Sequence, residues 1–138
     1  MTERVFVALG SNLGDRAAHL AHARQRLAGL PETRVAVVSQ VEETAPLGPI
    51  PQGTYLNQMV LLETTLTPEA LLAACRAIEA ERGRERRERW GPRTLDLDIV
   101  RFGAREIHEA GLTIPHPELP RRDFWLREIA ELETPSHV

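Results

Sequence analysis

The chain has 138 residues, of which 42% are hydrophobic and 27% are charged, and its formal net charge at pH 7 is −3. This length suits a single domain with one core, and the small negative charge argues against general binding to nucleic acid or to an anionic membrane. No apolar run is long enough to cross a bilayer, and the first residues do not resemble a leader segment, so we expect a cytoplasmic protein.

The first half of the chain predicts the order strand, helix, strand, strand. Residues 4–9 are apolar on both faces, which is typical of a strand covered on both sides. Asp15 follows a glycine-containing turn and is a suitable N-cap for a helix that ends near Leu30. The next predicted segments are a strand over residues 33–43, a proline-rich irregular loop over 44–53 and a strand over 55–65.

The second half predicts a helix, a strand and a final helix. Thr67 and Pro68 are suited to the cap and first position of a helix that ends at Gly83. Cys75 lies on the apolar face of this helix, where we expect a small core residue. The remaining predicted segments are an arginine-rich loop over 83–92 that is mobile without ligand, a strand over 94–102, an irregular stretch over 103–120 with room for a short hairpin, and a helix over 121–131.

The resulting order of strand, helix, strand, strand, helix, strand is the ferredoxin-like βαββαβ pattern. This α+β fold has an antiparallel four-stranded sheet with both main helices on one face, and we expect the C-terminal helix as an addition to it. No linker, repeat or low-complexity segment interrupts the chain. We therefore expect residues 1–138 to form a single domain.

The predicted strand over 94–102 has one apolar face and one acidic face, because Leu97 lies between Asp96 and Asp98. The two carboxylates would stand roughly 6–7 Å apart on the same face, where their repulsion favours a bound cation. The segment from Arg82 to Arg93, directly upstream, contains six arginines, the residue type best suited to grip phosphate. Together these features indicate a metal-bound polyphosphate; the alternative is a half-exposed strand after a solvated charged loop, with two unfavourably placed aspartates.

Several motifs agree with this interpretation. They are W-G-P-R-T-L-D-L-D-I-V at 90–100, G-S-N-L-G-D at 10–15, T-A-P-L-G-P at 44–49 followed by Y-L-N at 55–57, and I-P-H-P at 114–117 with R-R-D-F-W-L at 121–126. From Val5 to about Leu126 the chain resembles the 6-hydroxymethyl-7,8-dihydropterin pyrophosphokinases of folate biosynthesis. The resemblance implies transfer of pyrophosphate from ATP to the hydroxymethyl group of the pterin, with release of AMP and with two Mg²⁺ ions bound alongside ATP.

The resemblance also implies roles for individual residues. Catalytic roles fall on Arg84, Arg93 and Asp98, and metal binding on Asp96 and Asp98. ATP binding falls on Glu79, Arg86, Trp90, Ile99, Thr113, His116 and Arg122. Pterin binding falls on Thr44, Leu47, Tyr55, Asn57 and Phe124. Arg76 matches a further position facing the nucleotide, where the family usually has a neutral amide.

Two other functions remain open from the residues alone. A ferredoxin-like RNA-binding module would carry aromatic residues on its middle strands, and no such run is present. A non-catalytic nucleotide-binding domain would need the same ligands as the enzyme, so the sequence does not separate the two. We expect a monomer that acts on ATP and the pterin and does not bind nucleic acid.

Overall fold

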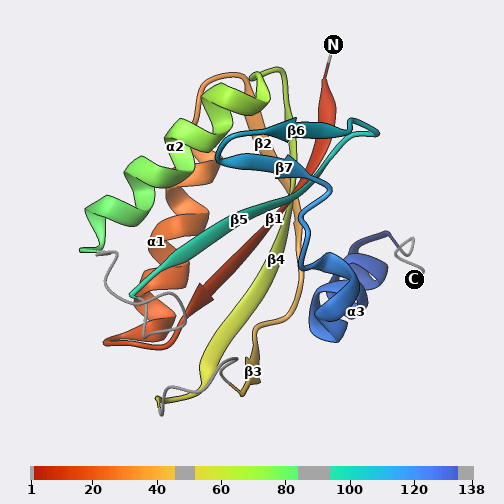
Figure 1. The fold of residues 1–138 in the computed structure, drawn as a ribbon. Helices are drawn as coiled ribbons and strands as arrows, with labels where there is room; N and C mark the ends of the chain where they lie inside the picture. Colours follow the sequence, from red (N-terminus) through yellow and green to blue (C-terminus); the bar gives the residue numbers. More distant parts are fainter. Residues whose placement is uncertain (1, 46–51, 84–93, 134–138) are drawn as a thin grey trace, which may run out of the picture.

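The computed structural model describes residues 2–45, 52–83 and 94–133 (Figure 1). Its core elements are β1 (Glu3–Ser11), α1 (Arg16–Ala28), β2 (Thr33–Val38), β4 (Tyr55–Thr64), α2 (Pro68–Glu81) and β5 (Asp96–Phe102). The additional elements are β3 (Glu42–Thr44), β6 (Ile107–Glu109), β7 (Leu112–Ile114), the short 3-10 helix η1 (Leu119–Arg121) and α3 (Asp123–Glu133). The predicted α+β ferredoxin-like class is confirmed.

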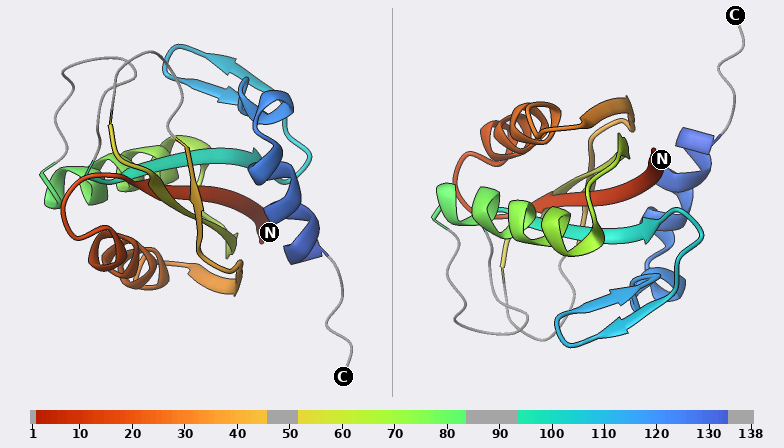
Figure 2. Two further views of the ribbon diagram at one scale, coloured as in Figure 1. Left: turned by 90° about the horizontal axis from the view of Figure 1, so that it is seen from below. Right: turned by 90° about the horizontal axis from the view of Figure 1, so that it is seen from above.

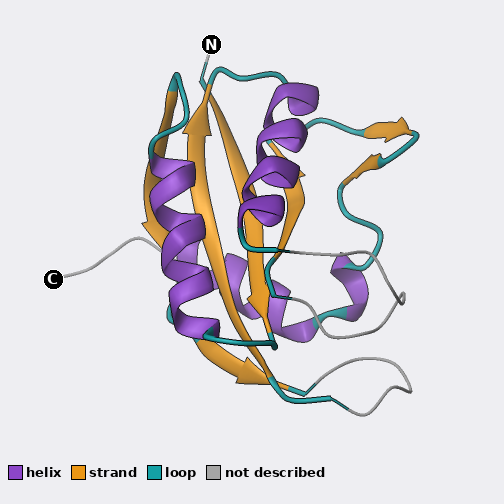
Figure 3. Cartoon of the chain, turned by 90° about the vertical axis from the view of Figure 1, so that its left-hand side faces the viewer, coloured by secondary structure: helices purple, strands orange, loops and turns teal. Residues whose placement is uncertain are grey.

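The main sheet has the strand order β2-β4-β1-β5, and every neighbouring pair is antiparallel. Figure 3 shows α1 and α2 together in front of this sheet, with α3 behind it. β1 is the central strand, since it pairs with β4 on one side and with β5 on the other, and it is buried from Val5 to Ser11. The hairpin of β6 and β7 extends from the β5 edge of the sheet (Figure 2).

Both main helices begin as their sequences predict. The Asp15 carboxylate accepts a hydrogen bond from the Ala18 amide at 3.2 Å, and the Thr67 hydroxyl accepts one from the Ala70 amide at 3.1 Å. These bonds satisfy amide groups that have no partner within the helix. α2 ends at Glu81, shortly before Gly83, whose φ of +77° is a conformation that favours glycine.

Two apolar clusters lie on opposite faces of the sheet. The first lies beneath α1 and α2, and includes Cys75, which is 1% exposed as expected of a core residue. Burial is the main cause that raises the pKa of the Cys75 thiol to about 12, so the group stays neutral. The second cluster joins α3 to the other face through Phe6, Ala8, Met59, Leu61, Val100, Leu119, Trp125, Ile129 and Leu132.

The edge strand next to β4 differs from its prediction. Residues 33–43 were expected to form one strand, but the structure divides them into β2 and β3. At the break, the Ser39 amide donates to the Met59 carbonyl at 2.9 Å, while the Ser39 hydroxyl accepts from the Met59 amide at 2.8 Å. The Ser39 hydroxyl thus replaces a backbone carbonyl as the acceptor for the Met59 amide. The edge strand can therefore break at this point without leaving that amide of β4 unpaired.

The C-terminal part of the fold is close to its prediction. The hairpin anticipated within 103–120 forms as β6 and β7, and α3 begins at Asp123, two residues later than expected, because Pro120 belongs to η1. Within the parts of the chain that the structure describes, no helix has the length and hydrophobicity needed to span a membrane.

The first cluster should account for much of the stability. Ile78 of α2 is fully buried in this cluster, between the helix and the sheet, so Ile78→Ala should lower the free energy of unfolding by about 2–5 kcal/mol. Leu126 is a matched control on α3, because it is 40% exposed and Leu126→Ala should cost less than about 1 kcal/mol. Urea unfolding measures both changes, and equal losses would contradict the assignment of the core.

Candidate active site

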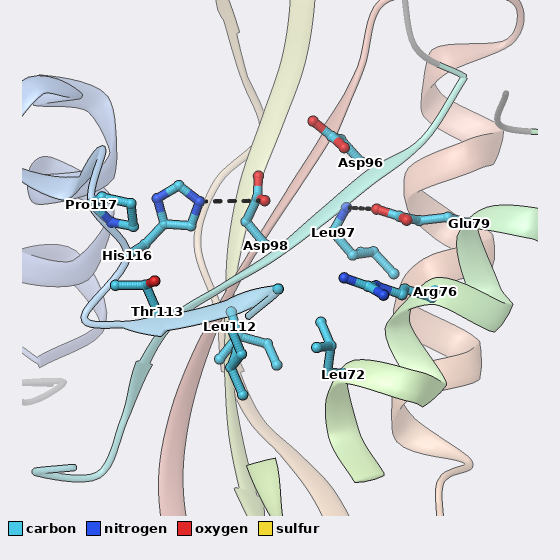
Figure 4. Close-up of a pocket in the computed structure, with 12 residues that line it drawn as sticks. Leu72, Arg76, Glu79, Asp96, Leu97, Asp98, Leu112, Thr113, His116 and Pro117 are labelled. Atoms are coloured by element: carbon cyan, nitrogen blue, oxygen red, sulfur yellow. Dashed lines mark hydrogen bonds and ion pairs between the residues drawn. The ribbon is translucent and has the colours of Figure 1, made fainter. Parts of the chain in front are cut away.

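Asp96 and Asp98 project from the same face of β5, as their spacing predicts. Both are half-buried, while Leu97 between them is 5% exposed and packs in the first cluster. Figure 4 shows the two carboxylates on the same side of the strand. Their register partners on β1 are Gly10 for Asp96 and Ala8 for Asp98. Because these partners are the two smallest residue types, no large side chain of β1 covers the carboxylates.

A cavity of about 310 Å³ opens beside the two aspartates, between α2, β5 and the β6–β7 hairpin (Figure 4). Its lining consists of Leu72, Arg76, Glu79, Asp96, Leu97, Asp98, Ile99, Gly111, Leu112, Thr113, His116 and Pro117. Gly111 has a φ of +82°, and a Cβ atom at this position would lie 3.3 Å from Nη2 of Arg76. The bare backbone at the hairpin therefore leaves room for the Arg76 guanidinium at the edge of the cavity.

Glu79 connects α2 to the strand that carries the aspartates. The residue is 7% exposed, and its Oε2 accepts a hydrogen bond from the Leu97 amide at 2.8 Å. This amide lies between Asp96 and Asp98, so the bond fixes the backbone from which both carboxylates project. A charged acceptor makes such a bond stronger than one between neutral groups.

His116 faces Asp98 from the opposite wall of the cavity. Its Nδ1 accepts a hydrogen bond from the Glu118 amide at 3.0 Å, which leaves the proton of a neutral ring on Nε2. Nε2 lies 3.6 Å from Oδ1 of Asp98. The backbone is held as well, because the His116 amide donates to the Val100 carbonyl at 2.9 Å. The imidazole is therefore oriented with its N–H group toward the carboxylate.

Trp125 supports three of the predicted site residues, and the sequence did not reveal this role. Its side chain is 2% exposed, and its ring lies edge-on to that of His116 with the centroids 5.0 Å apart. The Arg122 guanidinium stacks over the same ring at 4.4 Å, and the Phe124 ring lies 6.3 Å away. A tryptophan near the start of an amphipathic helix reads as ordinary core, so only the tertiary structure reveals these contacts.

Arg122 has an unused donor. Its Nε is buried and has no hydrogen-bond partner among the residues that the structure describes. Burying an N–H group without a partner is unfavourable unless a ligand accepts a hydrogen bond from it. With its guanidinium held over Trp125, Arg122 is suited to bind an anion.

A second group of polar and aromatic residues lies on the same face of the sheet, across β1 from the aspartates. Asn57 is the register partner of Gly10 on β4, and its amide nitrogen donates to the Thr44 hydroxyl. A Cβ atom on Gly10 would lie 3.4 Å from Oδ1 of Asn57 and 3.5 Å from the Tyr55 ring. β4 and β5 are two strand spacings apart, or about 10 Å, so a flat ligand over β4 could reach the aspartate side of the sheet.

The predicted site residues thus fall into three sets and a remainder. The cavity gathers Glu79, Asp96, Asp98, Ile99, Thr113 and His116. Thr44, Tyr55 and Asn57 lie together on β3 and β4, while Arg122 and Phe124 flank Trp125. Leu47, Arg84, Arg86, Trp90 and Arg93 lie outside the described residues, as does most of the predicted arginine loop.

The carboxylates of Asp96 and Asp98 suit a hard cation that takes most of its other ligands from water and substrate. Among the described residues, no group of three or more His, Cys, Asp or Glu side chains could enclose a metal ion. Magnesium is typically bound by one or two carboxylates together with water and substrate phosphates, which the pair Asp96 and Asp98 can supply. The cavity beside them then offers space for the rest of a phosphorylated ligand.

Comparison with known proteins gives a consistent result. Residues 6–134 match the family model described as 7,8-dihydro-6-hydroxymethylpterin-pyrophosphokinase. A 2-amino-4-hydroxy-6-hydroxymethyldihydropteridine pyrophosphokinase of Pseudomonas aeruginosa is 45% identical over 96% of this chain and 82% of its own length. Proteins of the same name are 41% identical in Methylorubrum extorquens, over 94% of this chain and 82% of the relative, and 42% identical in Bacillus subtilis, over 96% and 79%.

The bond between Glu79 and β5 is open to a direct test. Glu79→Ala leaves the buried Leu97 amide without its acceptor, so the free energy of unfolding should fall by about 1–3 kcal/mol. Glu79→Gln retains a side-chain carbonyl that can accept the same bond, and it should lose less. Urea unfolding of the ligand-free proteins provides the measurement. Equal losses in the two variants would show that the bond to Leu97 does not hold β5.

Proposed function

Because the chain belongs to the 7,8-dihydro-6-hydroxymethylpterin-pyrophosphokinase family, we propose that its cavity beside β5 holds ATP and that the surface of β3 and β4 holds the pterin. The protein is a pyrophosphokinase of folate biosynthesis. It transfers pyrophosphate from ATP to the hydroxymethyl group of 6-hydroxymethyl-7,8-dihydropterin, and AMP leaves. A non-catalytic nucleotide- or RNA-binding role, which the sequence left open, has no support from these relatives.

One observation carries the assignment of the two substrates. Asp96 on β5 and Asn57 on β4 have the same register partner, Gly10, so they lie on one face of the sheet and in one row across it. A phosphate chain in the cavity and a heterocycle over β4 would therefore meet above Gly10. This arrangement supports in-line transfer between two ligands that lie side by side, because it brings the reacting atoms together.

The enzyme acts on ATP with magnesium, and we assign two ions to Asp96 and Asp98. When bound, magnesium supplies the positive charge that neutralises the phosphate oxygens during transfer. His116 presents Nε2 toward the same space and would donate a hydrogen bond to a phosphate oxygen. The unused Nε of Arg122 would donate another. Asp98 is the candidate acceptor for the proton of the attacking hydroxyl group.

The remaining nucleotide contacts are assigned from the match to the family's motifs. Glu79, Ile99 and Thr113 line the cavity and are assigned to the nucleoside, with Ile99 and Thr113 acting through their backbones. Arg84 and Arg93 are assigned to stabilise the charge that develops during transfer, as arginines do in other phosphoryl transfers. Arg86 and Trp90 are assigned to ATP binding from the same segment.

The pterin is a flat ring with a hydrogen-bonding edge. The Asn57 amide and the backbones of Thr44 and Leu47 would bind that edge, while Tyr55 and Phe124 would stack on the ring faces. We propose that the protein acts as a monomer.

Coupled product measurement tests the function and the metal ligands together. AMP release from ATP and Mg²⁺ should depend on the dihydropterin, and AMP should appear in equal amounts to the pyrophosphorylated pterin. Asp96→Asn and Asp98→Asn should fold normally and lose nearly all turnover, because each removes an ionised ligand. Glu106→Gln is the control, since this exposed acid lies outside the cavity. Turnover near that of the control in both aspartate variants would refute the metal assignment.

The pterin surface calls for a separate variant. Asn57→Ala should raise KM for the pterin by about tenfold, equivalent to one hydrogen bond of about 1.4 kcal/mol, and leave KM for ATP nearly unchanged. Gln58→Ala is the matched control, because Gln58 is a buried amide on the other face of β4, where it donates to the Ser39 carbonyl. Steady-state kinetics with each substrate varied would decide the question. The same rise in pterin KM for both variants would argue against direct contact by Asn57.

A further inference from the structure

Glu128 is a buried acid that the proposed mechanism does not use. The residue is 2% exposed and lies on the face of α3 that packs against the sheet, where the other buried residues are Trp125, Ile129 and Leu132. Both carboxyl oxygens are buried, and neither has a hydrogen-bond partner among the residues that the structure describes. An ionised carboxylate is very unfavourable in such a position, so a specific reason for its presence is expected.

The acidic groups near Glu128 come from β3 and from α3 itself. Glu42 is an ion-pair partner of Arg127, with 2.6 Å between Nη2 and Oε1, and Glu131 on α3 accepts a hydrogen bond from the Gln40 amide at 3.1 Å. Three charged groups on other elements packed against α3 have partners other than Glu128: Glu63 of β4 pairs with Arg34, Arg121 of η1 with Glu118, and Arg101 of β5 with Glu133 at the far end of α3.

These surroundings keep Glu128 uncharged at neutral pH. Burial is the main cause that raises the pKa of Glu128 to about 9, and the neighbouring Glu42 carboxyl adds to it. Arg127 lowers the pKa of Glu128 and Glu131 raises it, but both effects are smaller than that of burial. As a neutral acid, Glu128 can lie near Glu42 without repulsion.

Arg127, the neighbour of Glu128 on α3, pairs with Glu42 of β3, so Glu128 lies where α3 meets β3, and both elements carry proposed pterin residues. Glu128 follows Phe124 by one turn of α3, and Glu42 is the register partner of Asn57, with Thr44 two residues further along β3. We propose that buried Glu128 is a positioning residue for the pterin: it holds α3 against β3 and so places Phe124 opposite Asn57. This inference rests on the proposed function, because it assumes that the pterin binds over β3 and β4.

The inference predicts a selective effect of alkaline pH. Ionised Glu128 would place a second negative charge beside Glu42 in a buried position, which separates α3 from β3. The pterin surface depends on that contact, whereas the ATP cavity is built mostly from α2, β5 and the β6–β7 hairpin. Pterin binding should therefore weaken more than ATP binding as Glu128 ionises, because among the described ATP-binding residues only His116 and Arg122 contact α3, through Trp125.

Stability should follow the same titration. The ordinary pKa of a glutamate in an unfolded chain is 4.5, and that of Glu128 in the folded protein is about 9. The folded state therefore holds a proton that the unfolded state has lost, and the stability from Glu128 declines as pH rises from 4.5 to about 9. Glu128→Gln keeps a neutral side chain of similar shape, so its melting temperature should exceed that of the wild type by a margin that grows with pH.

The decisive experiment measures KM for the pterin and KM for ATP between pH 6.5 and pH 10 in three proteins: wild type, Glu128→Gln and Glu131→Gln. Wild type and Glu128→Gln should have similar pterin KM near pH 7. Above pH 9, the wild-type pterin KM should be about tenfold higher than that of Glu128→Gln, a factor in the ordinary range of coupling between sites. Any titration of the pterin itself affects all three proteins equally and cancels in the ratio.

Glu131→Gln is the control, because it removes a charge from the same helix and keeps an oxygen that can accept from the Gln40 amide. Since Glu131 has the smallest of the named effects on the pKa of Glu128, this variant should stay close to the wild-type pH dependence. Two results would overturn the positioning role: a ratio between wild type and Glu128→Gln that does not change with pH, or equal changes in the KM values for pterin and ATP. If wild type shows no pterin turnover at any pH, the proposed function is refuted, and so is the role of Glu128 in positioning the pterin site. The pH-dependent difference in melting temperature would still report the ionisation of Glu128 in that case.

Discussion

The side chains of the central strand β1 alternate between the two faces of the sheet, and the two faces require different surfaces. Toward α1 and α2 it offers Val5, Val7 and Leu9, which are all buried in the first cluster. Toward the other side its residues decrease in size along the strand, from Phe6 to Ala8 to Gly10. α3 packs where the side chains are large, and the candidate site opens where they are small. The same strand thereby supports a core and leaves a ligand surface open.

Two buried glutamates illustrate different ways of tolerating an acid inside this fold. Glu79 has a backbone amide as a partner, so its acceptor capacity is used to hold β5 in place. Glu128 has no such donor among the described residues, and its environment favours the protonated form instead. Both lie at junctions between a helix and a strand. Each therefore affects how the elements that carry site residues are placed relative to one another, without itself having to contact the reacting atoms.

Much of the fold and part of the site could be predicted from local patterns. The alternation around Leu97 indicated the acidic face of β5, and Thr67 with Pro68 indicated the start of α2, because both depend on residues close in sequence. The division of the edge strand at Ser39 could not be predicted, since it depends on hydrogen bonds to Met59, which is 20 residues away. The roles of Trp125 and Glu128 were missed for the same reason. Their contacts arise only when α3 packs against the sheet, and no local pattern encodes them.

The position of Trp125 also bears on how this site can change during evolution. One ring contacts His116 and Arg122, which are assigned to the phosphates, and Phe124, which is assigned to the pterin. A substitution at Trp125 would alter the environment of both substrates together, so selection on one would be constrained by the other. Tyr55 and Asn57 lie on a different strand from Asp96 and Asp98, with β1 between them. Natural variation that retunes recognition of a single substrate should therefore accumulate around β4 and be scarce around Trp125.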